Sequence, residues 1–411
     1  MQLPEQCETT QCVIAGGGPA GLMLGVLLAR AGVAVTVLEK HADFLRDFRG
    51  DTIQPSTMEI MAELGWLEEF LALHHQKVHR LNAQFGDTRL TLADLTHLPV
   101  RAPYVAMMPQ WDFLNFLAAK GRQYPCFRLL MESEATALIE TQTRVTGVIA
   151  ETLNGPLQIR AKLTVAADGR NSVLRDASGL PLQDFGAPMD ALWFPLPRHP
   201  DDTDETQARF DAGRIFVMLN RGSYWQCAFV IPKGGFDAVK AAGLDVFRAS
   251  LKPLLPVPPE RADSIVGWEQ VKLLTVQVNR LQRWWRSGFL AIGDAAHAMS
   301  PIGGVGVNLA VQDAVAAANA LAAPLRVGRA EDGHLAAVES RRRFPTHATQ
   351  RLQLILQNTV IAPTLVAKGP IRPPLALRLL ASLPVLGRIP ARLLGLGFRQ
   401  EHVRTPQADP P

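Results

Sequence analysis

The first forty residues alternate between short apolar runs and one longer apolar stretch, a pattern that predicts two strands with a helix between them. Residues 12–15 form a short apolar run, which is typical of a buried strand. Residues 19–31 are apolar on almost every side, as in a helix packed inside a protein, and a β-branched run follows at 34–38. This strand–helix–strand order predicts a βαβ unit at the start of the chain.

The rest of the chain continues this alternation and then changes in texture. Helical spacing of apolar residues predicts further helices over 57–73 (with a break at Gly65), 113–119 and 307–322. Short apolar runs predict strands at 144–149, 157–165, 215–219, 224–231 and 289–292. Between about residues 180 and 281, prolines and alternating apolar positions favour a mainly antiparallel sheet, inserted between parts of an α/β domain.

Charge and cysteine content exclude some functions. The net charge is only +4 and no block of Lys and Arg stands out, so we expect no nucleic-acid partner. The four cysteines form no CxxC pair, which is typical of reduced thiols and favours a cytoplasmic protein with no metal site. The acidic stretch 201–205 is interpreted as a solvated connection.

A glycine-rich turn follows the first predicted strand. Gly16 allows a tight turn, Gly18 lets the backbone approach a pyrophosphate, and Gly21 lets the helix pack closely on the strand. The helix start at Pro19 and Ala20 would present free N–H groups to the phosphates. At the end of the second strand, Glu39 can accept hydrogen bonds from a ribose, and Lys40 beside it could face a 2′-phosphate. This arrangement predicts a dinucleotide site and leaves FAD and NAD both open.

Two later motifs place an aspartate beside a glycine just after a buried strand. They are Asp168-Gly169 and Gly293-Asp294, on either side of the predicted sheet insertion. Open α/β sheets bind ligands at this edge, where each carboxylate could accept hydrogen bonds from a sugar or ribityl hydroxyl. The alternative for either residue is a simple cap on the helix that follows.

With these motifs in this order, the chain resembles the para-hydroxybenzoate hydroxylase family, the class A single-component FAD-dependent aromatic monooxygenases. The resemblance covers residues 10–350. It implies that the GxGxxG turn and Glu39 hold the ADP half of FAD, that Asp294 bonds the ribityl chain, and that Asp168 stabilises the pyrophosphate region. Arg49 resembles the family arginine that reaches the FAD phosphates, and Gln110 the glutamine that contacts the flavin; a surface arginine and a helix-capping glutamine are the alternatives.

The loop from Ser300 to Asn308 leads into a predicted helix. Backbone N–H groups around Val307 and Asn308 can face the N1–C2=O edge of a flavin, where the reduced ring carries negative charge. Gly304 and Gly306 permit close approach to a flat ring. By resemblance, Pro301 places its carbonyl near the reacting face of the flavin. The catalytic roles expected here belong to the backbone of Pro301, Val307 and Asn308.

The resemblance also implies a domain organisation. We expect an α/β fold in which a Rossmann-like FAD-binding domain carries an inserted antiparallel sheet domain and a helical C-terminal part. The FAD-binding domain takes residues 1–75, 100–180 and 282–350, the substrate-binding sheet domain takes 76–99 and 181–281, and the C-terminal helical segment and tail take 351–411. The C-terminal leucines and arginines could touch a membrane, but the prolines among them favour packing on the protein or on a second subunit. Both a monomer and a homodimer fit.

The activity implied is hydroxylation of an aromatic or polycyclic substrate with NADPH or NADH and O2, through a flavin C4a-hydroperoxide. The apolar sheet domain would shield that chemistry from water. Core packing is the alternative for each candidate wall residue: Trp193, Phe194, Phe216, Met218, Tyr224, Trp225 and Phe229. The competing functions are a flavin-dependent reductase, a halogenase, although no Trp-x-Trp-x-Ile-Pro segment is present, and a non-catalytic FAD-binding electron-transfer or regulatory protein.

Overall fold

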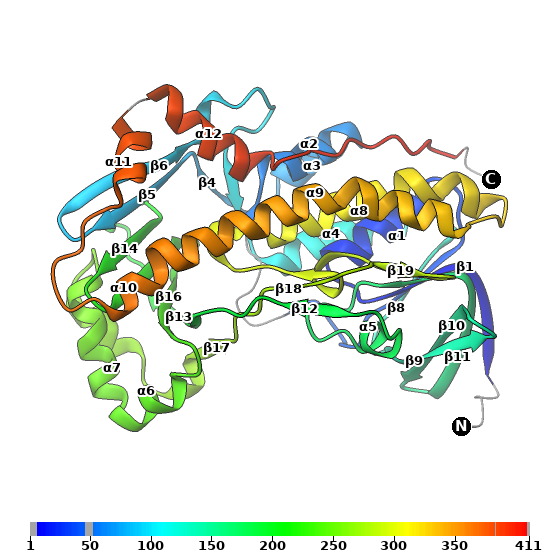
Figure 1. Ribbon diagram of the computed structural model, residues 1–411, viewed down its shortest axis with the longest axis horizontal. Helices are drawn as coiled ribbons and strands as arrows, with labels where there is room; N and C mark the ends of the chain where they lie inside the picture. Colours follow the sequence, from blue (N-terminus) through cyan, green and yellow to red (C-terminus); the bar gives the residue numbers. More distant parts are fainter. Residues whose placement is uncertain (1–5, 46–51, 383, 409–411) are drawn as a thin grey trace.

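The computed structural model describes residues 6–45, 52–382 and 384–408, and one half of it is built on a parallel sheet (Figure 1). β1 lies in the middle, with β11 and β20 on one side and β2 and β8 on the other. Each neighbouring pair among them is parallel. The strands are β1 Cys7–Ala15, β2 Val35–Leu38, β8 Phe127–Leu130, β11 Gly155–Ala166 and β20 Phe289–Ala291. The α/β class is therefore confirmed.

Helices pack along this sheet and on one another. α1 links β1 to β2, which confirms the βαβ unit, and it lies against both α4 and α8. The predicted helix over 57–73 is two helices, with Gly65 at φ +75° between them. The bounds are α1 Pro19–Arg30, α2 Pro55–Glu63, α3 Leu67–Leu71, α4 Gln110–Gly121 and α8 Gly306–Arg326.

An antiparallel extension grows from β11. β10 pairs with the first half of β11 and β20 pairs with its second half, while β1 pairs with both halves. The predicted pairing of 144–149 with 157–165 is confirmed. The remaining elements of this part are β9 Glu134–Thr141, β10 Arg144–Thr152, α5 Val173–Ala177 and β19 Trp285–Arg286.

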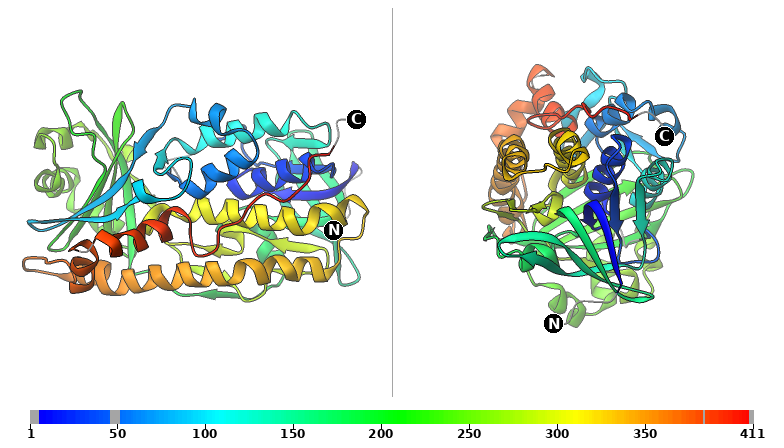
Figure 2. Two further views of the ribbon diagram at one scale, coloured as in Figure 1. Left: turned by 90° about the horizontal axis from the view of Figure 1, so that it is seen from above. Right: turned by 90° about the vertical axis from the view of Figure 1, so that its right-hand side faces the viewer.

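The inserted domain is a seven-stranded sheet at the other end of the elongated molecule (Figures 1 and 2). All its neighbouring pairs are antiparallel except β14 with β5. The sheet also includes β5 and β6, which precede its other strands in the chain. In sheet order the strands are β17 Lys272–Leu274, β13 Met189–Pro197, β16 Tyr224–Pro232, β15 Arg214–Asn220, β14 Gln207–Asp211, β5 Arg80–Phe85 and β6 Thr88–Asp94.

Two small sheets join the halves. One runs β12-β18-β21 and the other β3-β7-β4. Their strands are β12 Leu182–Asp184, β18 Asn279–Leu281, β21 His297–Ala298, β3 Thr52–Ile53, β7 Val105–Met107 and β4 Gln76–Val78. β3 and β21 flank segments of the predicted cofactor site.

Most of the aromatic residues considered as walls of a substrate site are core residues instead. One face of the seven-stranded sheet packs on α6 Phe236–Ala242 and α7 Leu244–Leu251, two helices that the sequence pattern did not reveal. The side chains buried there include Phe194, Phe216, Met218, Trp225 and Phe229. Trp193 alternates with Phe194 along β13 and so faces the opposite side of the sheet.

The C-terminal part begins with a long helix. α9 Asp332–Leu356 lies beside α8 along the length of the molecule and crosses residue 350, where the predicted domain boundary falls (Figure 1). It continues through a π-helical turn, Gln357–Ile361, into α10 Ala362–Val366, followed by α11 Leu375–Ser382 and α12 Pro384–Gly395. The chain then returns along the half that holds the parallel sheet, where the amide of Ala408 donates to the carbonyl of Arg30 at 2.8 Å.

The region around α8 is apolar enough to raise the question of a membrane span. By length and composition, Ile302–Arg326 could cross a bilayer, but 72% of its apolar window is buried inside the protein. Contacts with α1 and α9 account for this burial. The core helix of a soluble protein passes the same test, so the apolar character of α8 is weak evidence for a membrane span.

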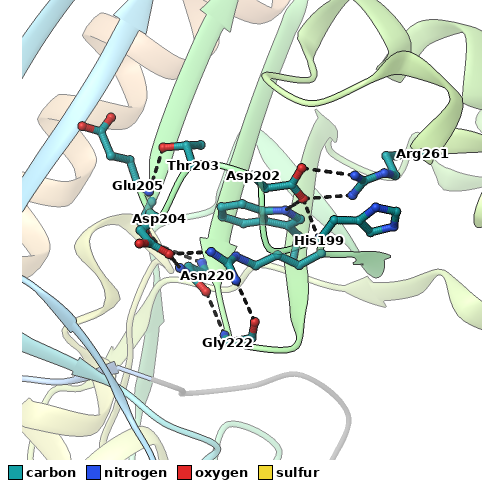
Figure 3. A network of polar contacts seen from close by, with 11 residues as sticks. His199, Asp202, Thr203, Asp204, Glu205, Asn220, Gly222 and Arg261 are labelled. Atoms are coloured by element: carbon teal, nitrogen blue, oxygen red, sulfur yellow. Dashed lines mark hydrogen bonds and ion pairs between the residues drawn. The ribbon is translucent and has the colours of Figure 1, made fainter.

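The acidic stretch 201–205 is not simply a solvated connection, which corrects the sequence interpretation. The side chain of Asp202 is only 5% exposed and accepts hydrogen bonds from the His199 amide, the Trp225 indole and both terminal nitrogens of Arg261 (Figure 3). Burial favours the neutral acid, but the hydrogen bonds outweigh it and hold the pKa of Asp202 at about 2. Charge density alone suggested solvent exposure, whereas the distant partner Arg261 could not be read from the sequence.

We expect Asp202→Asn to destabilise the sheet domain by about 3 kcal/mol, because Arg261 then loses its buried partner. The matched control is Asp204→Asn: its side chain is 88% exposed, and we expect a change below about 1 kcal/mol. Because the folded pKa is depressed from 3.8, the stabilisation by Asp202 is present above pH 3.8 and is lost as the pH falls toward 2. Urea unfolding measures both variants; equal effects would contradict this role.

Candidate functional site

The glycine-rich turn after β1 has the geometry that its sequence predicts. Gly16 has φ +105°, and a Cβ on it would lie 2.3 Å from the carbonyl oxygen of Ala167. A Cβ on Gly21 would lie 1.9 Å from the carbonyl oxygen of Gly16. Gly18 differs, since a Cβ there would meet nothing within 4 Å. Gly16 and Gly21 are therefore required by the fold, whereas Gly18 faces open space.

That open space lies at the start of α1. Gly18 is the N-cap and Pro19 the first helical residue, and no side chain caps this end. Among the described residues, no acceptor is found for the amides of Ala20 and Gly21. Free amides at a helix start, together with the helix dipole, bind anionic groups such as phosphates.

Glu39 stands at the end of β2 beside this turn. Its buried carboxylate accepts hydrogen bonds from the Gly17 and His41 amides, each at 3.1 Å. These contacts orient the acid next to the glycine turn, where the sequence places a ribose-binding residue. Lys40 points elsewhere: its ammonium lies 3.5 Å from Glu134, and the side chain is 56% exposed.

The second motif, Asp168-Gly169, packs directly on the glycine-rich turn. The backbone of Ala167 and Asp168 is what a side chain at Gly16 would strike. Asp168 accepts a hydrogen bond from the Ser172 hydroxyl and one from the Leu174 amide at 3.3 Å, so its carboxylate caps the start of α5. Burial raises the pKa of Asp168. The capping alternative therefore describes what the side chain of Asp168 does.

The third motif, Gly293-Asp294, contacts both of the others. Gly293 has φ +59°, and a Cβ there would lie 3.1 Å from the Cβ of Ala20 in α1. The next residue, Asp294, is 29% exposed, and its carboxylate lies 3.4 Å from the guanidinium of Arg170, which follows the Asp168-Gly169 pair. The three sequence motifs thus meet at one edge of the parallel sheet, as open α/β folds require for ligand binding.

The loop before α8 is held from β3. Gly303 and Gly304 have φ +80° and +60°, which favours glycine at both. The carbonyl of Gly304 accepts a hydrogen bond from the Thr52 hydroxyl at 2.8 Å and one from the side-chain amide of Gln54 at 3.3 Å. The carbonyl of Pro301 accepts from the Gly304 amide at 3.0 Å and so closes the turn.

α8 then begins with free amides. Its N-cap, Val305, supplies no side-chain cap, and no acceptor for the amides of Gly306, Val307 and Asn308 is found in the described part of the chain. This gives the site a second uncapped helix start. The side chain of Asn308 is turned inward, where its Oδ1 accepts from the hydroxyls of Ser56 at 2.7 Å and Thr57 at 2.9 Å.

Two further residues, Gln110 and Arg49, were predicted to contact FAD. Gln110 is the first residue of α4, after Pro109 as N-cap. Arg49 lies outside the described residues, so its predicted contact with FAD phosphates stays a prediction.

A buried charge cluster lies under the third motif. The carboxylate of Asp313 on α8 accepts from the Gly293 amide at 3.1 Å, lies 2.6 Å from Nε2 of His297, and accepts from Nε of Arg342 at 2.8 Å. Glu401 contacts the same arginine at 3.5 Å. Burial disfavours the charged acid, but His297 and Arg342 outweigh it and lower the pKa of Asp313. The cluster holds the backbone that carries Asp294.

These features fit a dinucleotide with an isoalloxazine ring. Two uncapped helix starts suit a pyrophosphate and a negatively charged ring edge, Gly18 leaves space for the former, and Asp294 can face a ribityl chain. Among the described residues, no group of three or more His, Cys, Asp or Glu side chains could hold a metal ion.

Comparison with known proteins decides the family. The family described as FAD binding domain matches residues 9–352. The 6-methylpretetramide 4-monooxygenase of Streptomyces rimosus is 32% identical over 376 residues, 90% of this chain and 88% of that protein. The chain belongs to the FAD-dependent aromatic monooxygenase family. This confirms the resemblance inferred from the motifs, the FAD cofactor and the assignment as a monooxygenase.

Solved structures agree on the fold. PqsL, a probable FAD-dependent monooxygenase from Pseudomonas aeruginosa, aligns with a TM-score of 0.73 at 22% identity, covering 87% of this chain and 98% of that one. OxyS anhydrotetracycline hydroxylase from Streptomyces rimosus aligns with a TM-score of 0.73 at 24% identity, covering 94% and 76%. Because both identities are below 25%, this similarity shows that the chain shares their fold, and no more.

Sequence reasoning missed the residues that position the site. Thr52, Gln54 and Arg170 contact the predicted motifs through long-range pairs, and Asp313 supports Gly293 from α8. Local signals existed for two of them: Thr52 follows the Arg49 segment, and Arg170 directly follows Asp168-Gly169. Asp313 had a weaker signal, since an acid in an otherwise apolar small-residue helix is unusual unless it is paired.

Proposed function

We propose that this monooxygenase uses NADPH or NADH and O2 to hydroxylate a polycyclic or other apolar aromatic substrate. The observation that carries the proposal is the contact between the loop at Pro301 and the inserted sheet domain. Ile302, the next residue, packs against a hydrophobic cluster that includes Phe85, Phe210 and Ile215 of the seven-stranded sheet, together with Val360 and Ile361 after α9. The loop on the predicted flavin side therefore packs on the same apolar cluster as the sheet domain.

Different residues of this chain bind different parts of FAD in this proposal. We assign the pyrophosphate to the start of α1 at Gly18 and the ribose to Glu39, with Asp294 held toward the ribityl chain by Arg170. FAD, when bound, supplies hydride acceptance from the nicotinamide and activation of O2. The amides at Gly306, Val307 and Asn308 face developing negative charge from a fixed helix start, and the sheet domain excludes water.

The substrate class rests on similarity and on apolar surroundings. The relative that is 32% identical is named for 6-methylpretetramide, and another, 27% identical over 319 residues, for 12-dehydrotetracycline and anhydrotetracycline. The second match spans only 60% of that relative's length. The family also includes proteins with other names, such as a dialkyldecalin synthase at 25% identity. A substrate panel must therefore include compounds that would expose a different reaction.

The test is anaerobic stopped-flow reduction of the FAD-loaded protein by NADPH and by NADH, with and without phenols and polycyclic phenols. We expect one compound class to accelerate flavin reduction about tenfold or more, because substrate stimulation is the control expected of this mechanism. Product analysis after admission of oxygen should find a hydroxylated compound. Bound flavin that neither nucleotide reduces would contradict the proposal, and halogenation in the presence of bromide would favour the halogenase alternative.

A further inference from the structure

Three buried glutamines, two on α9 and one directly after its end, lie beside the segment that carries Pro301. Gln350, Gln353 and Gln357 are spaced by three and four residues, so they share one face of the helix. Their side chains are 0%, 3% and 0% exposed. Buried glutamines are uncommon unless their amides are hydrogen-bonded. Here the bonds of Gln353 and one bond of Gln350 go to the backbone between Ala298 and Ile302.

Gln353 makes the central contacts. Its Oε1 accepts from the Ser300 amide at 3.2 Å, and its Nε2 donates to the carbonyls of Ser300 and Ile302, both at 2.9 Å. The two carbonyls stand on either side of Pro301. One side chain therefore fixes the peptide group between Ser300 and Pro301 and the one between Ile302 and Gly303, while the proline carbonyl closes the turn to Gly304.

The other two glutamines, Gln350 and Gln357, hold neighbouring backbone and side-chain groups. We call the three glutamines together the glutamine clamp. Gln350 donates to the carbonyls of Asn279 at 2.8 Å and Ala298 at 3.1 Å. Gln357 donates to the Ser300 hydroxyl at 3.3 Å, while its Oε1 is buried with no hydrogen-bond partner found. Gln357 also opens the π-helical turn, an irregularity that occurs frequently at functional sites.

We propose that Gln353, assisted by Gln350 and Gln357, is a positioning residue that holds the Pro301 loop in the conformation that receives the flavin. The inference rests on the proposed function, because it takes this loop as the flavin side of the site. Glutamine suits the task because it supplies a donor pair and an acceptor without adding charge beside a ring that becomes negative. Thr52 and Gln54 hold the other end of the loop at Gly304, so the loop is fixed from two elements.

The decisive variant is Gln353→Met, which keeps the size of the side chain and removes all three hydrogen bonds. We expect the dissociation constant for FAD to rise about thirtyfold, with a shifted visible spectrum and midpoint potential of the bound flavin. The matched control is Gln158→Met, a residue in β11 that is 4% exposed and lies outside the loop contacts. Its FAD affinity, spectrum and potential should stay within about twofold of wild type.

Gln353→Glu adds a readout that a purely structural role would not move. Ionised glutamate would face two carbonyls without a donor, whereas the protonated acid regains one donor. FAD affinity of this variant should therefore rise as the pH falls from about 8 to about 6, since burial raises the pKa of a carboxyl group, and wild type should not follow.

The outcomes separate the clamp from the function. Wild type that fails to bind FAD overturns the proposed function itself. Suppose instead that the wild type binds FAD and hydroxylates a substrate, and that the Gln353→Met protein has the same FAD affinity, flavin spectrum and midpoint potential. That result overturns only the positioning role of Gln353. If Gln353→Met does not fold, Gln357→Leu removes a single bond and is expected to weaken FAD binding about threefold. No change in that variant would count against the clamp.

Discussion

Replacing Gly18 with valine is expected to weaken FAD binding about a hundredfold or more while the apoprotein stays folded. The backbone at Gly18 has φ −77° and ψ −175°, which any residue adopts, and an added Cβ meets nothing within 4 Å. Valine is a poorer N-cap than glycine, so we expect a loss of about 1 kcal/mol in stability. The same side chain would stand where the pyrophosphate approaches, and affinity should fall about a hundredfold or more.

The control for this variant is Gly21→Val, three residues further along. A Cβ there would lie 1.9 Å from a backbone oxygen, so the substitution should destabilise the protein itself by about 3 kcal/mol. FAD fluorescence titration and thermal unfolding of the apoproteins measure the two effects separately. If Gly18→Val binds FAD as wild type does, the pyrophosphate does not lie at this turn.

Asp313→Asn is expected to have the largest effect on stability, about 3–5 kcal/mol. Asparagine leaves the buried Arg342 without its carboxylate and weakens the contact with His297. It also loosens the Gly293 amide, so FAD affinity should fall together with stability. Because the pKa of Asp313 is lowered in the folded state, its contribution is present above the pKa of an unfolded aspartate and is lost as the pH falls below it.

The matched control is Asp263→Asn. Asp263 pairs with Lys252 at 3.0 Å, but its side chain is 51% exposed, and we expect a change below about 1 kcal/mol. Urea unfolding at neutral pH compares the two variants. A loss of stability at Asp313 no greater than at Asp263 would show that the buried cluster is not what holds the third motif.

The sequence predicted most of the FAD-binding half because its signals are local. The glycine turn, Glu39 and the two aspartate–glycine pairs follow strands that can be read from short apolar runs, and parallel strands bring their ends to one edge. The helix break at Gly65 was equally local. β8 was missed because residues 127–130 alternate apolar and charged residues only briefly.

The parts that sequence reasoning could not reach depend on contacts between distant residues. Asp202 looked like one acid among several until Arg261 was placed against it. The aromatic residues of β13, β15 and β16 could not be divided between core and substrate side without knowing that α6 and α7 cover one face. The glutamines of α9 carry no motif, and only the fold places Gln353 beside Pro301.

The most direct test of the central claim is turnover under ¹⁸O₂ with the FAD-loaded protein, a nicotinamide cofactor and a panel of polycyclic phenols. The account predicts that mass spectrometry will find one atom of ¹⁸O in the hydroxylated product, since a monooxygenase transfers a single atom from O2. A product that carries oxygen from water instead, or a flavin-loaded protein that consumes NADPH or NADH and releases only hydrogen peroxide with every compound, would contradict it.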